Sequence, residues 1–122
     1  MPLKVIGIDH IQIAVPRALE GQCLAFYREV LGLEEIAKPP ELRGRGGAWF
    51  QAGPIQVHIG IDAEGSPPSK RHICFLVADS GAAKAAIAAD GVFIEGESQT
   101  DGLARFFIRD PAGNRLEIGQ RV

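Results

Sequence analysis

Apolar and polar residues alternate along residues 5–15, and this alternation predicts the first strand of the chain. Ile11, Ile13 and Val15 fall on one side of the pattern, and His10 and Gln12 fall on the other. Successive side chains of a strand point to opposite faces of its sheet, so a period of two indicates a half-buried strand.

The period changes between residues 18 and 31, where apolar residues recur at helical spacing. They lie at i, i+4, i+7, i+8, i+11 and i+12, which places them on one face of an amphipathic helix. Gly32 follows at the position where a left-handed C-cap is expected. The apolar positions are Leu19, Cys23, Phe26, Tyr27, Val30 and Leu31.

The rest of the first half is predicted to add three strands. Gly53 and Pro54 separate the last two and suit a hairpin turn. A polar stretch with proline and glycine follows over residues 62–70, and we take it as a linker. The predicted segments are a short strand over 33–37, a loop over 38–47 and hairpin strands over 48–52 and 55–61.

The second half repeats this order. Asp79 or Ser80 is a suitable cap for a helix that runs to about residue 89. The pattern of strand–helix–strand–strand–strand, twice, predicts an α+β fold of two βαβββ modules. We expect one domain over residues 1–122, with module one at about 5–61 and module two at about 71–120. The predicted strands of module two are 71–78, 92–95, 103–109 and 115–120.

Composition excludes several classes of function. The 122 residues suffice for one ordinary domain, and the net charge of −2 gives no reason to expect a nucleic-acid partner. No apolar run approaches the roughly 20 residues of a membrane helix, and residues 1–4 lack a secretory signal. Two cysteines do not form a disulfide framework, so we expect a cytoplasmic protein without a membrane partner.

All three histidines and one late glutamate occupy matched positions in the two modules. His10 and His72 each lie in the first strand of a module, and His58 and Glu117 lie in the last strands. The offsets nearly agree, because 72 minus 10 gives 62 and 117 minus 58 gives 59. Such placement predicts one site that is built from two copies of a module.

Alternation places each of these four residues on the less apolar face of its strand. The opposite, all-apolar face is expected to pack under a helix, which leaves the four candidates on the open, concave side of the sheet. Their neighbours on that face are Gln12 for His10, Gln56 and Gly60 for His58, Cys74 for His72, and Arg115 and Gly119 for Glu117.

The chemistry of this set predicts a metal centre. Neutral imidazoles and a carboxylate suit Fe(II), Mn(II), Co(II), Ni(II) or Zn(II). Two histidines and one carboxylate form a facial triad with open positions, and a third histidine closes one more. A single histidine on a half-buried strand is more often a hydrogen-bonded residue than a ligand. The same-face placement and the repeat symmetry together favour one divalent metal ion per site.

Three segments of the chain resemble the vicinal oxygen chelate superfamily, which includes glyoxalase I, bleomycin-resistance proteins, fosfomycin-resistance proteins and extradiol dioxygenases. They are residues 10–15, residues 26–33 and the final hairpin over 106–117. The resemblance covers essentially the whole chain. It implies two βαβββ modules that form a U-shaped, partly open trough of mixed β-sheet around a divalent metal, with helices on the outer face.

The resemblance also implies roles for the four candidates. His10, His72 and Glu117 fall where fosfomycin-resistance enzymes and extradiol dioxygenases place two histidines and a glutamate. His58 falls where glyoxalase I has a fourth ligand, normally a glutamate that also serves as the proton-transfer base. A histidine there departs from the glyoxalase pattern, and His58 is expected to act as ligand or as catalytic base. Bleomycin-binding relatives usually lack the ligands, so the chain departs from them as well.

Two classes of function follow from the resemblance. The first is a metal-dependent enzyme, a glyoxalase-like lyase or isomerase or a dioxygenase, which chelates a small oxygen-rich substrate through two oxygens. The second is a non-catalytic protein that binds an antibiotic or toxin in the same trough. Relatives whose sites are completed by two chains suggest a homodimer.

The residues around the predicted site suggest how a small-molecule substrate is held. We expect contacts from Gln12, Trp49 and Arg105, and an anionic group bound by Arg45, whereas Arg43 in the same loop is expected to be a solvated loop charge. Lys70 and Arg71 are expected to be linker charges, and Cys74 a small buried thiol packed in the sheet.

Overall fold

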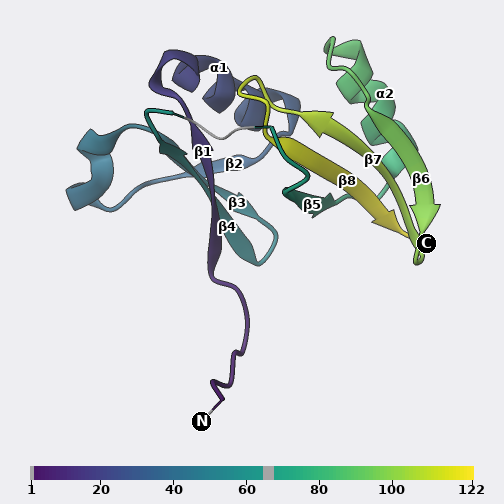
Figure 1. Cartoon of the computed structure of the whole chain (residues 1–122), viewed down its shortest axis with the longest axis horizontal. Coiled ribbons are helices and arrows are strands. Elements are labelled where there is room, and N and C mark those ends of the chain that lie inside the picture. Colours follow the sequence, from purple (N-terminus) through teal and green to yellow (C-terminus); the bar gives the residue numbers. More distant parts are fainter. Residues whose placement is uncertain (1, 65–67) are drawn as a thin grey trace.

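Two four-stranded mixed sheets, one in each module, form the body of the molecule (Figure 1). The computed structural model describes residues 2–64 and 68–122. The strand orders are β1-β4-β3-β2 and β5-β8-β7-β6, so the two modules share one topology and neither sheet closes. Module one contains β1 (His10–Val15), β2 (Glu34–Ile36), β3 (Ala48–Ala52) and β4 (Ile55–Ile61). Module two contains β5 (His72–Leu76), β6 (Gly96–Thr100), β7 (Leu103–Arg109) and β8 (Arg115–Arg121).

Helical segments cover one face of each sheet (Figure 1). In module one a 3₁₀ turn, η1 (Arg17–Leu19), leads into α1 (Glu20–Ala25) and a π turn, η2 (Phe26–Val30), and Gly32 ends the segment at φ 68°. In module two Asp79 caps α2 (Ser80–Ala89) by accepting a hydrogen bond from the Ala82 amide at 3.0 Å. The predicted helices and the Gly32 cap are confirmed. None of the described helices is long and apolar enough to cross a membrane.

The parallel strand pairs have the same register in both modules. His10 pairs with Gln56 on β4, and two positions later Gln12 pairs with His58. In module two His72 pairs with Arg115 on β8, and two positions later Cys74 pairs with Glu117. The structural repeat therefore makes His10 equivalent to His72 and His58 equivalent to Glu117.

The strand alternation places the apolar faces of both sheets in the core, as predicted. Val15, Val57, Phe50, Ile108 and Leu116 are almost completely buried. They pack with residues of the helical segments, including Cys23, Phe26, Tyr27 and Ile87. The opposite face of each sheet carries the polar candidates.

A buried carboxylate joins the two modules. Asp110, in the turn between β7 and β8, accepts a hydrogen bond from the Tyr27 hydroxyl at 2.6 Å. Its other bonds come from Ala112 N, Asn114 N and Asn114 Nδ2, each at 2.9 Å. Asn114 Nδ2 also donates to the Ala14 carbonyl at 3.0 Å. Burial, reinforced by the Asp110 charge, raises the pKa of Tyr27, so the hydroxyl keeps its proton.

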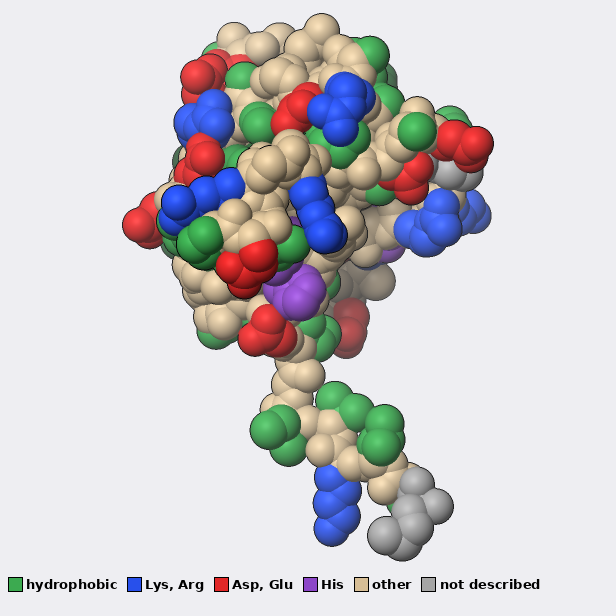
Figure 2. Space-filling view, turned by 90° about the vertical axis from the view of Figure 1, so that its left-hand side faces the viewer, with side chains coloured by type: hydrophobic (Ala, Val, Ile, Leu, Met, Phe, Trp, Pro, Cys, Tyr) green, Lys and Arg blue, Asp and Glu red, His purple; other side chains and the backbone are tan. Residues whose placement is uncertain are grey.

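Two predicted strands were wrong in their bounds. The strand expected over 5–15 begins only at His10, because its partner β4 begins at Ile55 and earlier residues have no ladder to join. Residues 2–9 form an exposed, extended arm that projects from the body (Figure 2).

The strand expected over 92–95 lies instead at 96–100, where every side chain is exposed. Such a polar edge strand pairs with β7 alone, so it lacks the apolar pattern. The loop expected over 38–47 contains a 3₁₀ segment, η3 (Pro40–Arg45).

The link between Tyr27 and Asp110 makes a testable contribution to stability. Tyr27→Phe removes one donor from a buried carboxylate, so we expect the free energy of unfolding in urea to fall by about 1–3 kcal/mol. Arg28→Gln is the matched control, because the ion pair between Arg28 and Glu35 is exposed and should contribute no more than about 1 kcal/mol. Equal effects of the two substitutions would contradict the proposed importance of the buried bond.

Candidate metal centre

His10 and His58 lie against each other on the polar face of the module-one sheet. Their rings stack with centroids 4.2 Å apart and planes inclined by 15°. Trp49 stacks on His58 with centroids 3.7 Å apart. The register explains this stack, because His58 pairs with Gln12 on one side and with Trp49 on the other. We call His10 and His58 half-site one.

The environment of His58 favours its neutral form. Its residue surface is only 5% exposed. Burial lowers its pKa below the ordinary value of 6.5, the charge of His10 lowers it further, and Asp9 acts in the opposite direction. At pH 7 the ring is therefore neutral and presents a lone pair.

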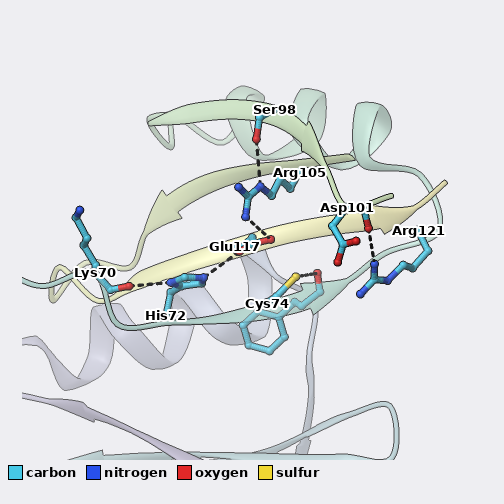
Figure 3. A network of polar contacts seen from close by, with 9 residues as sticks. Lys70, His72, Cys74, Ser98, Asp101, Arg105, Glu117 and Arg121 are labelled. Carbon is cyan, nitrogen blue, oxygen red and sulfur yellow. Dashed lines mark hydrogen bonds and ion pairs between the residues drawn. The ribbon is translucent and has the colours of Figure 1, made fainter. Parts of the chain in front are cut away.

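His72 and Glu117 form a second pair on the polar face of the module-two sheet (Figure 3). His72 Nε2 lies 2.9 Å from Glu117 Oε1. Arg105 Nη1 lies 3.6 Å from Glu117 Oε2, and the Phe107 ring meets His72 edge-on with centroids 5.4 Å apart. Glu117 is 3% exposed, so its carboxylate is stabilised by contacts with these neighbours and not by water. We call His72 and Glu117 half-site two.

One ring nitrogen of every histidine is held by an oxygen acceptor. A carboxylate or carbonyl oxygen only accepts, so the held nitrogen carries the hydrogen. The other nitrogen of His10 and of His58 presents its lone pair, whereas the other nitrogen of His72 faces Glu117 Oε1 at 2.9 Å. Metal-binding histidines are typically fixed in this way. The contacts are His10 Nδ1 to Asp9 Oδ2 at 2.8 Å, His58 Nε2 to Gln56 Oε1 at 2.9 Å and His72 Nδ1 to the Lys70 carbonyl at 2.8 Å.

These donors fit a divalent transition metal. Three imidazole lone pairs and one carboxylate are the ligand types that such metals take. In half-site two His72 Nε2 lies 2.9 Å from Glu117 Oε1, so the two atoms are close enough to bind the same ion.

The four candidates fall into two pairs within one chain. Across residues 2–64 and 68–122, no group of three or more His, Cys, Asp or Glu side chains lies close enough to hold a metal. The convergence of all four donors in one cleft is therefore not realised inside a single chain. The two stacked rings also direct their lone pairs along nearly parallel planes. One ring would have to turn for both to bind one ion, and His10, with 46% of its side chain exposed, has room to do so.

The other predicted substrate residues are only partly gathered around the half-sites. Gln12 lies on half-site one, where its side chain fills the space over Gly60, and Trp49 stacks there as described. Arg105 contacts half-site two. Arg45 ends η3, an exposed segment on the side of module one away from the module-two sheet (Figure 1). Its role in binding stays a prediction.

Cys74 differs from the expectation of a buried thiol. It is exposed on the polar face of β5, because β5 is an edge strand that only β8 neighbours in the described sheet. Partial burial of its sulfur, followed by the neighbouring Glu117 charge, raises its pKa to about 11. The thiol is therefore protonated at neutral pH.

Sequence reasoning assigned no role to Phe107 and Arg115, which lie beside half-site two. Phe107 pairs with Glu117 as Trp49 pairs with His58, so it is the module-two equivalent of Trp49. The Arg115 guanidinium carbon lies 3.8 Å from the Phe107 ring centroid. Arg115 shares the alternating face of Glu117, and this was the signal in the sequence.

Comparisons with known proteins agree with the fold of this chain. The family model described as Glyoxalase/Bleomycin resistance protein/Dioxygenase superfamily matches residues 7–118. The comparison with curated proteins found no significant match.

Several solved structures share the fold over nearly the whole chain. A protein of Bacillus anthracis assigned to the glyoxalase family is 36% identical, with a TM-score of 0.91 and 100% of both chains covered. Lactoylglutathione lyase from Agrobacterium tumefaciens is 25% identical, with a TM-score of 0.73 and coverage of 93% of this chain and 92% of the other. TnmS3, an antibiotic binding protein from Streptomyces sp. CB03234, is 18% identical, with a TM-score of 0.79 and coverage of 99% and 100%. The last likeness concerns the fold alone.

The depressed pKa of His58 can be measured directly. We expect its ring to titrate below pH 6.5 in an NMR titration, and Trp49→Ala to move the midpoint upward because it removes part of the burial. The unfolded chain takes up this proton first as pH falls. The contribution of His58 to stability is thus complete above about pH 6.5 and decreases below it. A midpoint at or above 6.5 in the wild-type protein would contradict this environment.

Proposed function

Because the chain belongs to the Glyoxalase/Bleomycin resistance protein/Dioxygenase superfamily, we propose that it is a divalent-metal-dependent enzyme of the vicinal oxygen chelate type. Its substrate is a small oxygen-rich molecule, and its reaction is of the lyase or isomerase class. The observation that carries this proposal is the orientation of the histidines, because one ring nitrogen of each is held by an oxygen. The other nitrogen of His10 and of His58 presents a lone pair, and that of His72 lies beside the candidate ligand Glu117.

His10, His72 and Glu117 are the proposed ligands. A bound divalent metal would supply Lewis acidity, which stabilises negative charge on a substrate oxygen. The ring nitrogens of His10 and His72 are oriented for this role by Asp9 and by the Lys70 carbonyl. Glu117 is buried, and so it keeps a fixed position beside His72.

His58 is proposed to move the proton. The ring lies between Trp49 and His10, and Gln56 holds its Nε2, which leaves Nδ1 to accept a proton from a substrate carbon or oxygen. Its lowered pKa keeps this nitrogen unprotonated at pH 7. This position favours the lyase or isomerase class, because a dioxygenase uses the triad of two histidines and a carboxylate without a fourth donor.

We propose a homodimer in which half-site one of one copy faces half-site two of the other. Two pairs that stay apart in one chain each supply half of a ligand set. The arm over residues 2–9 supports a second copy, because it leads directly into His10 and its apolar side chains project into solvent (Figure 2). Leu3, Val5, Ile6 and Ile8 are 66–102% exposed, and covering such side chains is favourable.

A second candidate function is binding of an antibiotic or toxin without chemistry. A cavity of about 740 Å³ lies between the modules, against β5 and α2, and is lined mainly by apolar residues. Its size suits a small organic molecule. A protein that works only through this cavity would need none of the four ligands.

Metal retention separates the two functions. Protein prepared without chelator and dialysed against Fe(II), Mn(II), Ni(II) or Zn(II) should hold about one ion per chain, measured by mass spectrometry of the metals. We expect His10→Ala, His72→Ala and Glu117→Ala each to weaken retention by more than about tenfold, because each removes a ligand. His58→Ala should keep the metal and lose turnover of a dicarbonyl hemithioacetal.

Arg43→Ala is the matched control, because this exposed side chain donates, among the described residues, only to the Lys38 carbonyl. It should leave retention unchanged. Full metal occupancy in all three ligand variants would rule out the ligand assignment, and an intact fold without any metal in the wild-type protein would favour the binding function.

A further inference from the structure

A polar cavity of about 320 Å³ lies at the junction of the modules, where β1 meets β5 and β8. Its volume holds about ten water molecules, which is room for a small ionic group and part of the molecule that carries it. No Asp or Glu lines it within the described part of the chain. Its polar lining consists of Gln12, Ser69, Arg71, His72, Asn114 and Arg115.

Arg71 lines this cavity and has no carboxylate partner among the described residues. Its Nε and its backbone amide contact Ser69 Oγ at 3.1 and 3.2 Å, which fixes the start of the side chain. Across residues 2–64 and 68–122, no Asp or Glu oxygen lies within ion-pair distance of it. Elsewhere in the chain, Arg28 and Arg109 are bound to carboxylates at 2.6 Å.

Arg115 is likewise unpaired with any carboxylate among the described residues. Its guanidinium carbon lies 3.8 Å from the centroid of Phe107, so it sits over the ring. Stacking occupies the flat face of a guanidinium and leaves the N–H groups at its edge available. The Arg115 guanidinium is thus held in one place, and its N–H groups are available to donate hydrogen bonds to a ligand.

Two carboxylates that contact residues of the cavity lining are already engaged. Glu117 contacts His72 and Arg105. Asp110 accepts four hydrogen bonds, from Tyr27, from Ala112 and twice from Asn114. Neither is available to neutralise Arg71 or Arg115, so the cavity carries an uncompensated positive charge.

We propose that Arg71 and Arg115 form an oxyanion-binding pocket, which holds a phosphate, phosphonate or carboxylate group of a small molecule beside His72. Guanidinium groups bind such anions through paired, charge-assisted hydrogen bonds. The pocket itself needs no metal, and it rests on the proposed function only in assigning the anion to the substrate. Within the proposed function, this pocket restricts the substrate to an anionic, oxygen-rich molecule.

The repeat explains why this pocket belongs to module two. Arg115 occupies the position that Gln56 occupies in module one, since each pairs with the first histidine of its module. Gln56 holds His58, whereas Arg115 stacks on Phe107. A bound anion would therefore lie at the module-two end of the site and orient the substrate.

Titration of metal-free protein with inorganic phosphate tests the pocket. Chelator-treated protein in a low-salt buffer without phosphate should show saturable shifts in a ¹H–¹⁵N NMR spectrum, concentrated at Ile73, Gly113 and Asn114. Arg71→Gln and Arg115→Gln should each weaken the affinity at least tenfold, and Arg71→Lys should lose less than Arg71→Gln. Arg43→Gln, which alters an exposed arginine on η3, should leave the affinity unchanged.

Two outcomes would overturn the pocket. One is the absence of saturable phosphate binding, and the other is unchanged affinity in both glutamine variants. If Arg115→Gln disturbs the fold, Arg71→Gln decides, because Arg71 lies in the linker before β5. Metal retention of the same variants keeps the two proposals apart. It should stay at the wild-type level, and a failure of metal binding in the wild-type protein would not change the phosphate result.

Discussion

The parallel pairing of the first and last strands of each module is the constraint on which the rest of the site depends. Because β1 pairs with β4 in the register in which β5 pairs with β8, each module brings its two candidate ligands to one place on the polar face of its sheet. A slip of one residue would turn every side chain of a strand to the other face. The apolar positions on the opposite face oppose such a slip, because they fill the core. The core thus specifies the position of the ligands.

The junction of the modules depends on a smaller set of bonds. Asp110 connects η2 to the turn between β7 and β8 through Tyr27, and Asn114 connects that turn to Ala14 on β1. Asp110 and Tyr27 are buried, and an unsatisfied carboxylate there would be costly. The bonds of Asp110 and Asn114 fix the position of the cavity that Arg71 and Arg115 line, beside half-site two. The two modules have also diverged in charge, since half-site one is surrounded by aromatic and amide groups and half-site two by arginines.

Much of the fold could be predicted from the sequence, because alternation and helical spacing report directly on burial. The strands over 48–52 and 55–61 and the Gly32 cap are examples. The start of β1 could not be predicted, because Val5 and Ile8 continue the apolar pattern where β4 no longer offers a partner. The polar strand β6 was missed for the opposite reason, since an exposed edge strand has no apolar face to reveal it.

The candidate site could be predicted only to the level of the half-site. A period of two shows which face a side chain occupies, but it carries no information on the distance between two modules. The separation of His10 and His58 from His72 and Glu117 therefore appears only in three dimensions. Arg71 looked like a linker charge in the sequence, because its place in the cavity depends on how β1 and β5 meet.

The most direct measurement is complementation between two defective chains. His10→Ala/His58→Ala and His72→Ala/Glu117→Ala are each expected to bind no metal, whereas mixed dimers of the two contain one intact site. Random mixing of equal amounts should restore about a quarter of the wild-type metal content. No recovery in a sample whose mixed dimers are verified by native mass spectrometry would contradict a site shared between two chains.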